Sequence, residues 1–458
     1  MLFILPLVFT ATAFSILNSS MVNVALPTIM SEFGVDFQYS TWLYTGYMLP
    51  YAIGMPIFGS LGDSYGSKLV FLVGIAFFSL GSLLCSTADS FWYLLAFRAV
   101  QALGASAIMP NGMVLATSPF DPGRRGEILG WWGMVSSAGS LIGPTLGGVL
   151  TEHFGWYSIF YVNLPFAAAV LVLGSKYIPA VPGKSGPVRF DAAGAGLLTV
   201  SLLALLLTIS IGGSKGFLRP QIWLMTVVFL LTAVFFVRRE KRIAQPLIAV
   251  ELFRRAAFAA TVIVSFIQSM ALFGGLLLIP MFLQHVHEFS PSYSGILVLP
   301  LSLTMMIMSP LMGRIAAKQN IRHWVMLGMG LIAVGMGLFS VLKLESRYWV
   351  LATALVVTGL GLGMSGTLLS ANLVNLVPNS QLGMASGVFN MSRFVGGVIG
   401  STIFGAFMQT RLSYHFAQLG GMEKLAMTEA FRDVYLLAAA VTLFGAAAAS
   451  LLNEKAVL

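Results

Sequence analysis

The chain has 458 residues, of which 57% are hydrophobic and only 9% are charged. This composition excludes a soluble globular domain of this size and is typical of an all-α polytopic membrane protein whose helices contact the lipid bilayer. The 25 lysines and arginines outnumber the 16 acids, but the cations gather in loops expected on one side of a membrane, so the positive charge does not indicate a nucleic-acid partner.

Apolar runs long enough to cross a bilayer recur along the whole chain. We interpret the first run as a membrane helix rather than a signal peptide, because no basic segment precedes it in the sequence and the run continues to Leu26. A short basic leader before Met1 stays open. The runs predict about fourteen membrane-spanning helices, at residues 3–26, 40–60, 69–88, 91–116, 127–150, 155–176, 191–212, 221–237, 258–283, 293–313, 323–342, 348–371, 383–408 and 432–452.

The loops on one side of these helices contain most of the cations, which the positive-inside rule places in the cytoplasm. An even number of helices returns both termini to that side of the cell membrane. The cytoplasmic loops hold Lys68, Arg124, Arg125, Lys184, Arg189, Arg238, Arg239, Lys241, Arg242, Arg254, Arg255, Arg314, Lys318 and Arg322, and the outer loops hold only Lys215, Arg219, Lys343, Arg347, Arg411 and Lys424.

A short polar stretch, residues 59–68, separates the second and third apolar runs. Its glycines, Gly59 and Gly66 among them, allow tight turns and close approach of helix ends. We expect Asp63 to lie where the following helix begins, so that its charge meets a helix N-terminus. With Lys68 at its end, the stretch resembles the signature loop of the major facilitator superfamily and implies a gating hinge, with serines at 64 and 67 where that family usually has arginine. A plain interhelical loop is the alternative.

The fourth run contains an arginine, Arg98, followed by Gln101 and Gly104. A charge inside a membrane helix is costly and indicates a functional site, although an arginine extending to the interface is the alternative. The segment resembles the arginine motif of helix 4 in the same superfamily, with Ala102 where glycine is usual.

The fifth run repeats small residues at intervals of four. Gly139, Gly143 and Gly147 therefore share one helix face, where a neighbouring helix can pack closely, and Pro144 can bend the helix. With Gly148, the segment resembles the antiporter motif of the superfamily. Ordinary small-residue packing is the alternative.

Further segments narrow the resemblance. Residues 17–27, residues 154–165 and the start of the seventh helix at Phe190-Asp191 resemble the fourteen-helix drug:proton antiporter family. The resemblance implies a secondary transporter that exports amphipathic drugs or related organic molecules by alternating access, as in multidrug efflux and antibiotic resistance, with protons as the coupling partner and no cofactor.

One difference from the family pattern weakens the case for proton coupling. The family usually has aspartate where this chain has Asn18, and an amide does not titrate near neutral pH. No acid falls near the middle of a predicted helix. Glu32 and Asp36 are the best substitutes, although a solvated loop is the more ordinary place for both. The intramembrane charges are mainly Arg98 and Arg393, so an exporter of a neutral or anionic metabolite or lipid-like molecule, without proton coupling, is the alternative function.

The substrate-binding wall is expected to consist of aromatic, methionine and amide side chains near the helix centres. Each of them alone is more often a packing or lipid-facing residue. The candidates are Asn18, Asn23, Trp42, Tyr44, Tyr47, Trp131, Trp132, Gln268, Met270, Met305, Met306, Asn372 and Asn390.

A weak internal repeat suggests two related halves. A glycine at the end of helix 2, Gly59, is followed nine residues later by Lys68, and Gly313 is followed in the same way by Arg322. The expected division is a six-helix bundle at 1–177, two inserted helices with their loops at 178–257, and a second six-helix bundle at 258–458, in a major facilitator fold. We expect a monomer.

Other motifs do not support a second class of function. The glycines at 361, 363 and 366 lie inside a membrane helix, and the segment 183–185 lacks the first glycine of a phosphate loop. His285 and His287 have no further ligand spacing for a metal, and the single cysteine, Cys85, excludes an internal disulfide. A membrane-embedded enzyme would need clustered His, Asp or Ser near one interface, and none is apparent.

Overall fold

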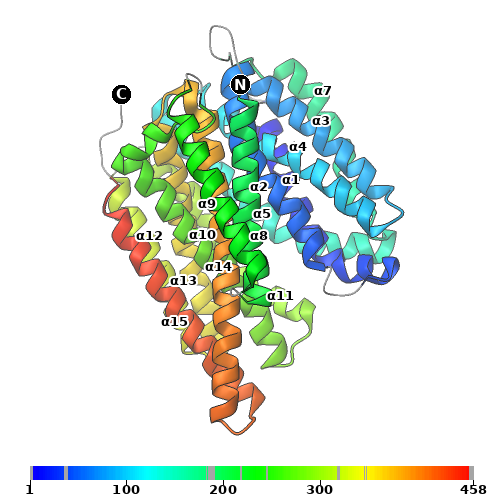
Figure 1. The fold of residues 1–458 in the computed structure, drawn as a ribbon, viewed down its shortest axis with the longest axis vertical. Helices are drawn as coiled ribbons and strands as arrows, with labels where there is room; N and C mark the ends of the chain where they lie inside the picture. The colour runs from blue at the N-terminus through cyan, green and yellow to red at the C-terminus, as the bar shows by residue number, and fades with distance from the viewer. Residues whose placement is uncertain are drawn as a thin grey trace. The chain divides into compact units, whose positions relative to one another are not determined.

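The computed structural model describes residues 4–35, 40–181, 183, 191–216, 219–243, 246–316, 320–344, 346 and 348–452, and the regular elements in these ranges are helices. Figure 1 labels the main ones. They are α1 (Ile4–Phe33), α2 (Ser40–Tyr65), α3 (Ser67–Ser86), α4 (Phe91–Thr117), α5 (Pro122–Phe154), α6 (Ser158–Tyr161), α7 (Asn163–Tyr177), α8 (Ala192–Lys215), α9 (Pro220–Glu240), η2 (Val250–Arg254), α10 (Ala256–His285), α11 (Pro291–Ala316), α12 (Ile321–Ser340), α13 (Tyr348–Leu376), η3 (Asn379–Gln381), α14 (Leu382–Gln418) and α15 (Glu423–Ala449).

Twelve helical spans within the described residues are long and apolar enough to cross a membrane, with α6 and α7 counted as one continuous span. The prediction of an all-helical membrane protein is therefore confirmed. The other two long helices, α2 and α5, are absent from these twelve. Both are rich in glycine, serine and proline, and α5 also begins and ends with charged residues.

The structure corrects the boundaries expected around the polar stretch 59–68. Helix α2 continues to Tyr65, so residues 59–65 are helical rather than a loop. Only Gly66 interrupts the helices, with a φ of +100° that favours glycine, before α3 starts at Ser67. A Cβ at Gly66 would lie 2.9 Å from the carbonyl oxygen of Val181, so the turn also needs the missing side chain for space.

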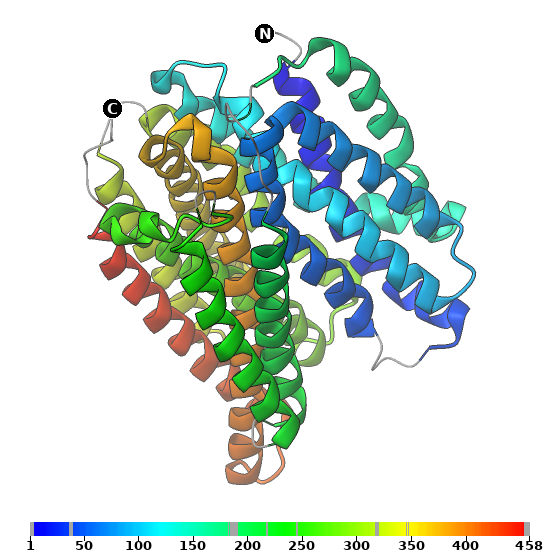
Figure 2. The ribbon, with the colours of Figure 1, turned by 45° about the horizontal axis from the view of Figure 1, so that its top comes forward.

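The chain divides into two compact units, and the first comprises residues 1–196, 239–249 and 377–391. Within it α1 packs on α5, α2 on α4, and α3 on both α4 and α7. Figures 1 and 2 both show α3 and α4 side by side. One apolar cluster joins α1 to α3, α4 and α6; its buried members include Met21, Ile29, Cys85, Phe91 and Ile159.

The second unit comprises residues 197–238, 250–376 and 392–458. There α11 packs on α13, and α12 packs on α13 and α15. Backbone-close contacts join α10 to α14, since a Cβ at Gly400 would meet the backbone of Met270. The order of pairing in the first unit thus recurs in the second. The pair α1–α5 corresponds to α10–α14, and α2–α4 corresponds to α11–α13. The contacts of α3 with α4 and α7 correspond to those of α12 with α13 and α15.

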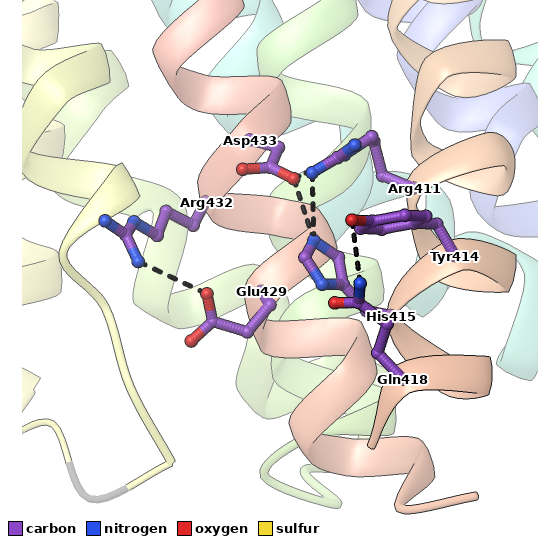
Figure 3. A network of polar contacts seen from close by, with 7 residues as sticks. All are labelled: Arg411, Tyr414, His415, Gln418, Glu429, Arg432 and Asp433. Atoms are coloured by element: carbon purple, nitrogen blue, oxygen red, sulfur yellow. Dashed lines mark hydrogen bonds and ion pairs between the residues drawn. The ribbon is translucent and has the colours of Figure 1, made fainter. Parts of the chain in front are cut away.

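A polar cluster ties the ends of α14 and α15 together in the second unit (Figure 3). The carboxylate of Asp433 accepts from Arg411 Nε at 2.5 Å and contacts His415 Nε2 at 2.8 Å. The Arg411 guanidinium lies over the Tyr414 ring, 4.6 Å from its centroid. The cluster therefore binds the two helices with one shared carboxylate.

Candidate functional site

A buried arginine lies at the centre of a polar network in the first unit. Arg98 on α4 is only 2% exposed. Its Nη1 donates to Asn18 Oδ1 of α1 at 2.9 Å and to Gln101 Oε1 at 2.6 Å. Because both acceptors are neutral amides, the guanidinium is hydrogen-bonded but not neutralised.

Aromatic rings cover the same guanidinium. The Arg98 Cζ atom lies 4.0 Å from the centroid of the Tyr47 ring of α2 and 5.9 Å from that of Phe160. The first distance is a close cation–π contact, which stabilises a cation that has lost its water. Tyr47 is itself 1% exposed and stacks on Tyr51, so α2 holds the ring in place over the arginine.

The network continues into α3 and α7 through Ser82. The Gln101 amide donates to Ser82 Oγ at 2.7 Å, and the Asn163 amide donates to the same oxygen at 3.3 Å. Arg98 forms no ion pair with a carboxylate in the described part of the chain. A buried cation without a counter-charge is costly, and it favours an anionic or strongly polar group nearby.

Two polar atoms of this region, Arg98 Nε and Asn163 Oδ1, have no hydrogen-bond partner among the described residues. Buried polar atoms are nearly always paired with protein, water or ligand. The network therefore has a donor and an acceptor left for a small polar group or water.

A second site joins α2 to the beginning of α14. The Asp63 carboxylate, 6% exposed, accepts from the backbone N–H groups of Gly383 and Met384, each at 2.8 Å. These belong to the first turn of α14, where N–H groups have no partner in their own helix. The negative charge also faces the positive end of the helix dipole.

This arrangement corrects the expected partner of Asp63. The sequence predicted the N-terminus of the following helix, α3, whereas the observed partner is α14, 320 residues along the chain. Close approach makes the contact possible, because a Cβ at Gly59 would collide with the carbonyl oxygen of Gly383. We call Asp63 with the N–H groups of Gly383 and Met384 the α2–α14 latch.

Lys68 also binds a helix end. Its Nζ donates to the carbonyl oxygen of Ser175 at 2.7 Å, in the last turn of α7. A cation at a helix C-terminus is favourable for the same reason that an anion is favourable at the N-terminus. The start of α3 is thereby fixed to the end of α7.

The glycine face of α5 lies against α1. A Cβ at Gly143 would lie 2.5 Å from Ser20 Cβ, and one at Gly147 would lie 2.8 Å from Met21 Cα. A Cβ at Gly139 would lie 3.2 Å from the carbonyl oxygen of Ala13. Gly148 is roomier, with only Val24 Cγ1 at 3.8 Å, and Pro144 is exposed. Three glycines therefore bring two backbones into direct contact.

The other candidate side chains differ in burial and in their contacts. Asn23, Trp42 and Trp131 are exposed on their helices. The amides of Gln268 and Asn372 join α10 to α13, at 2.7 Å from Ser365 Oγ and 2.9 Å from Thr261 Oγ1. The remaining candidates are placed as follows: the Asn390 amide donates to the carbonyl oxygen of Ser386 in its own helix, Trp132, Met305, Met306 and Arg393 are half-buried, and Met270 is buried.

Of the two proton-coupling candidates, the structure describes only Glu32. Asp36 lies outside the described residues, as does the side chain of Tyr44. Glu32 is exposed and accepts from Trp156 Nε1 at 2.7 Å. That bond ties the end of α1 to the short turn between α5 and α6.

Sequence reasoning missed two members of the Arg98 network, Ser82 and Asn163. Both are buried polar residues within apolar runs, and that pattern was the available signal. It also missed Glu240, which is 4% exposed at the end of α9. Its place next to two arginines in the sequence resembled a solvated loop, so nothing local distinguished it.

Comparison with known proteins identifies the family. The profile of the Major Facilitator Superfamily matches residues 8–401. The chain is 34% identical to the multidrug resistance protein Stp of Mycobacterium tuberculosis over 407 residues, covering 87% of this chain and 74% of that protein. It is 29% identical to the multidrug transporter protein MdtP of Bacillus subtilis, covering 88% and 74%. It is 30% identical to the tetracenomycin C resistance and export protein of Streptomyces glaucescens, covering 86% and 74%.

Solved structures agree at the level of the fold. The human organic anion transporter MFSD10 (TETRAN) aligns with a TM-score of 0.70 and 16% identity, covering 96% of this chain and 98% of that one. The proton:xylose symporter XylE aligns with a TM-score of 0.66 and 12% identity, covering 95% and 94%. The chain is a membrane-spanning transporter rather than an enzyme, and it belongs to the Major Facilitator Superfamily.

Proposed function

We propose that this protein is a secondary active transporter that exports amphipathic drugs or related organic molecules by alternating access, with protons as the counter-ion. The observation that carries the proposal is the α2–α14 latch, in which a charged group on one helix binds the free N–H groups of another. The names of the relatives, which include multidrug and antibiotic resistance proteins, support the substrate class.

The proposed topology has fourteen membrane-spanning helices, with α2 and α5 crossing the bilayer beside the twelve more apolar spans. Both termini lie in the cytoplasm of a cell-membrane protein, and the transporter works as a monomer. The recurring order of helix pairing supports two six-helix bundles, at 1–177 and 258–458, with α8 and α9 inserted between them.

The latch closes the cytoplasmic side in this mechanism and opens once in each cycle. Hydrogen bonds to a charged acceptor contribute about 1.5–3 kcal/mol each. Two such bonds stabilise one state enough to matter, yet substrate binding can offset them. The α1–α5 glycine contact supplies a smooth surface on which helices can shift without side chains interlocking.

A second candidate function follows from the Arg98 network. A buried cation held only by neutral amides and aromatic rings disfavours cationic substrates and favours neutral or anionic ones. This observation supports an exporter of a neutral or anionic metabolite or lipid-like molecule that does not use protons. The two candidates differ in substrate charge and in coupling.

One assay distinguishes the candidates. Purified protein in proteoliposomes is tested with one cationic and one anionic dye, with and without an imposed pH gradient. The first candidate predicts transport that a pH gradient accelerates. The second predicts preference for the anionic dye and no response to the gradient. Failure to transport either dye, in protein that still binds them, contradicts export of amphipathic molecules.

A further inference from the structure

A buried carboxyl group lies where the two inserted helices end. Asp191, directly before α8, accepts from Arg239 Nη2 at 2.7 Å and Nε at 2.9 Å, and from the N–H of Gly194 at 2.9 Å. Burial alone would raise the pKa of Asp191, but the Arg239 guanidinium and the Gly194 N–H outweigh it, so the pKa lies below its usual value. Asp191 is therefore ionised and forms an ion pair with Arg239.

Glu240 follows Arg239 in the chain, but the Arg239 guanidinium donates its hydrogen bonds to Asp191 and not to Glu240. Its Oε2 accepts from the backbone N–H of Ile248 at 2.9 Å, while Oε1 is buried and has no hydrogen-bond partner in the described part of the chain. A Cβ at Gly194 would touch both Asp191 Oδ2 and Glu240 Oε1, so two carboxyl groups line the same small space. The charged groups acting on Glu240 are Asp191 and Arg239.

The environment favours the neutral form of this carboxyl group. The apolar part of α9 ends at Val237, so Glu240 lies beyond it, after two arginines. Burial, and then the nearby Asp191 charge, raise the pKa of Glu240 to about 7. Proton exchange at such a group responds to ordinary changes in cytoplasmic pH.

A continuous chain of contacts leads from Glu240 to the α2–α14 latch, and all of it lies in the first unit. Ile248, bound to Glu240, precedes Ala249, whose N–H lies 3.0 Å from Met384 Sδ. Met384 donates its own N–H to Asp63 Oδ2. The segment 246–249 therefore touches Glu240 at one point and the first turn of α14 at the next.

We propose that Glu240 is a proton-binding site and that its charge controls how firmly segment 246–249 holds the first turn of α14 at the latch. This inference rests on the proposed transport function. The ionised carboxylate accepts the Ile248 N–H strongly and holds the segment in place. Uptake of one proton from cytoplasmic water onto Oε1 removes the charge and weakens that bond, and release returns the proton to water. Glu240 and segment 246–249 thereby connect proton binding to opening of the latch.

The first test measures proton binding without transport. Wild type, Glu240→Gln and the control Glu251→Gln, which removes an exposed acid of η2, are titrated in detergent from about pH 5 to about pH 9. The carboxyl band in the infrared spectrum is followed. We expect a carboxyl group that titrates near neutral pH in wild type and in the Glu251→Gln protein, and its loss in Glu240→Gln. Identical titrations for all three proteins would overturn the proposal.

The second test asks whether the charge reaches the latch. Hydrogen exchange of peptides covering 246–249 and 382–391 is compared between wild type and Glu240→Gln at the same pH, so that intrinsic exchange rates cancel. Above neutral pH we expect several-fold faster exchange in Glu240→Gln, and at acidic pH no difference. Equal exchange at every pH would sink the coupling.

The third test joins the site to transport. Glu240→Gln is expected to keep dye exchange between equal concentrations and to lose acceleration by a pH gradient, whereas Glu251→Gln keeps both. An unchanged gradient response in Glu240→Gln contradicts the inference. A wild type that transports dye but ignores the gradient contradicts proton antiport itself, and the titration and exchange tests still decide whether Glu240 binds the proton.

Discussion

Arg98 Nη1 and Asn18 Oδ1 are 2.9 Å apart, both buried, on helices α4 and α1. A guanidinium in the interior of a helix bundle is thus bound by an amide at the position where an acid would neutralise it. The amide cannot release or accept a proton near neutral pH. In this chain the Arg98 network has a constant charge, so the proton antiport proposed above would have to use another group.

Asn18→Asp should convert the network into an ion pair. The carboxylate would accept the same Arg98 hydrogen bond and would add an opposite charge, so a buried ion pair would replace the present bond between a guanidinium and a neutral amide. We expect higher thermal stability in detergent at neutral pH, a loss of that gain at acidic pH, and better transport of a cationic dye. Asn23→Asp, at an exposed position of the same helix, is the control and should change none of these. Equal behaviour of the two variants would show that residue 18 does not set the charge of the site.

Asp63→Asn tests the latch. The amide keeps the shape of the side chain but removes the charge, and its NH₂ group would face an N–H donor of α14. Loss of one charge-assisted bond costs about 1.5–3 kcal/mol, so we expect dye efflux to fall to background while membrane insertion is unchanged. Asp89→Asn, an exposed acid between α3 and α4, should transport normally. Full efflux from Asp63→Asn would remove the gating role.

Gly143→Leu tests the contact between α5 and α1. Even a Cβ at this position comes within 2.5 Å of Ser20 Cβ, so a leucine must push the helices apart. Overpacking typically costs about 1–3 kcal/mol, and we expect a lower melting temperature and strongly reduced transport. Gly148→Ala, where the nearest atom is 3.8 Å from the new Cβ, should be close to wild type. A fully active Gly143→Leu protein would show that close packing there is not needed.

The Glu240 site predicts a pH dependence of stability. The pKa of Glu240 lies at about 7 in the folded protein, against an ordinary value of 4.5. Between these values the folded state binds the proton that the unfolded state releases, so stability falls as pH rises through that window. We expect the melting temperature of wild type to decrease from about pH 5 to about pH 7 relative to that of Glu240→Gln, measured by differential scanning fluorimetry. Parallel curves for the two proteins would contradict this assignment.

Several features of the site could be predicted from local patterns. A charge inside an apolar run marked Arg98, and glycines at intervals of four marked the face of α5 that packs on α1. Both signals can be read from a short stretch of sequence. The helix period places residues four apart on one face, and a charged residue inside an apolar run is recognisable from its immediate neighbours. The end of α2 was predicted wrongly because only the local sequence was considered. Its glycines and serine resembled a loop, but this segment packs against Asn111 and Gly383 and is helical.

The amino-acid sequence by itself determined that this chain is a helical membrane protein, because apolar length and charge distribution follow directly from the cost of placing polar groups in lipid. Only the tertiary structure decided which helix end receives Asp63, which hydroxyl bridges Gln101 and Asn163, and which acid beside the inserted helices is buried with a carboxyl oxygen that has no hydrogen-bond partner in the described part of the chain. Those outcomes depend on side chains that are far apart in the chain and that only packing brings together. The need of a helix end or of a buried polar group for a hydrogen bond is visible in the local sequence, but the group that satisfies it is not.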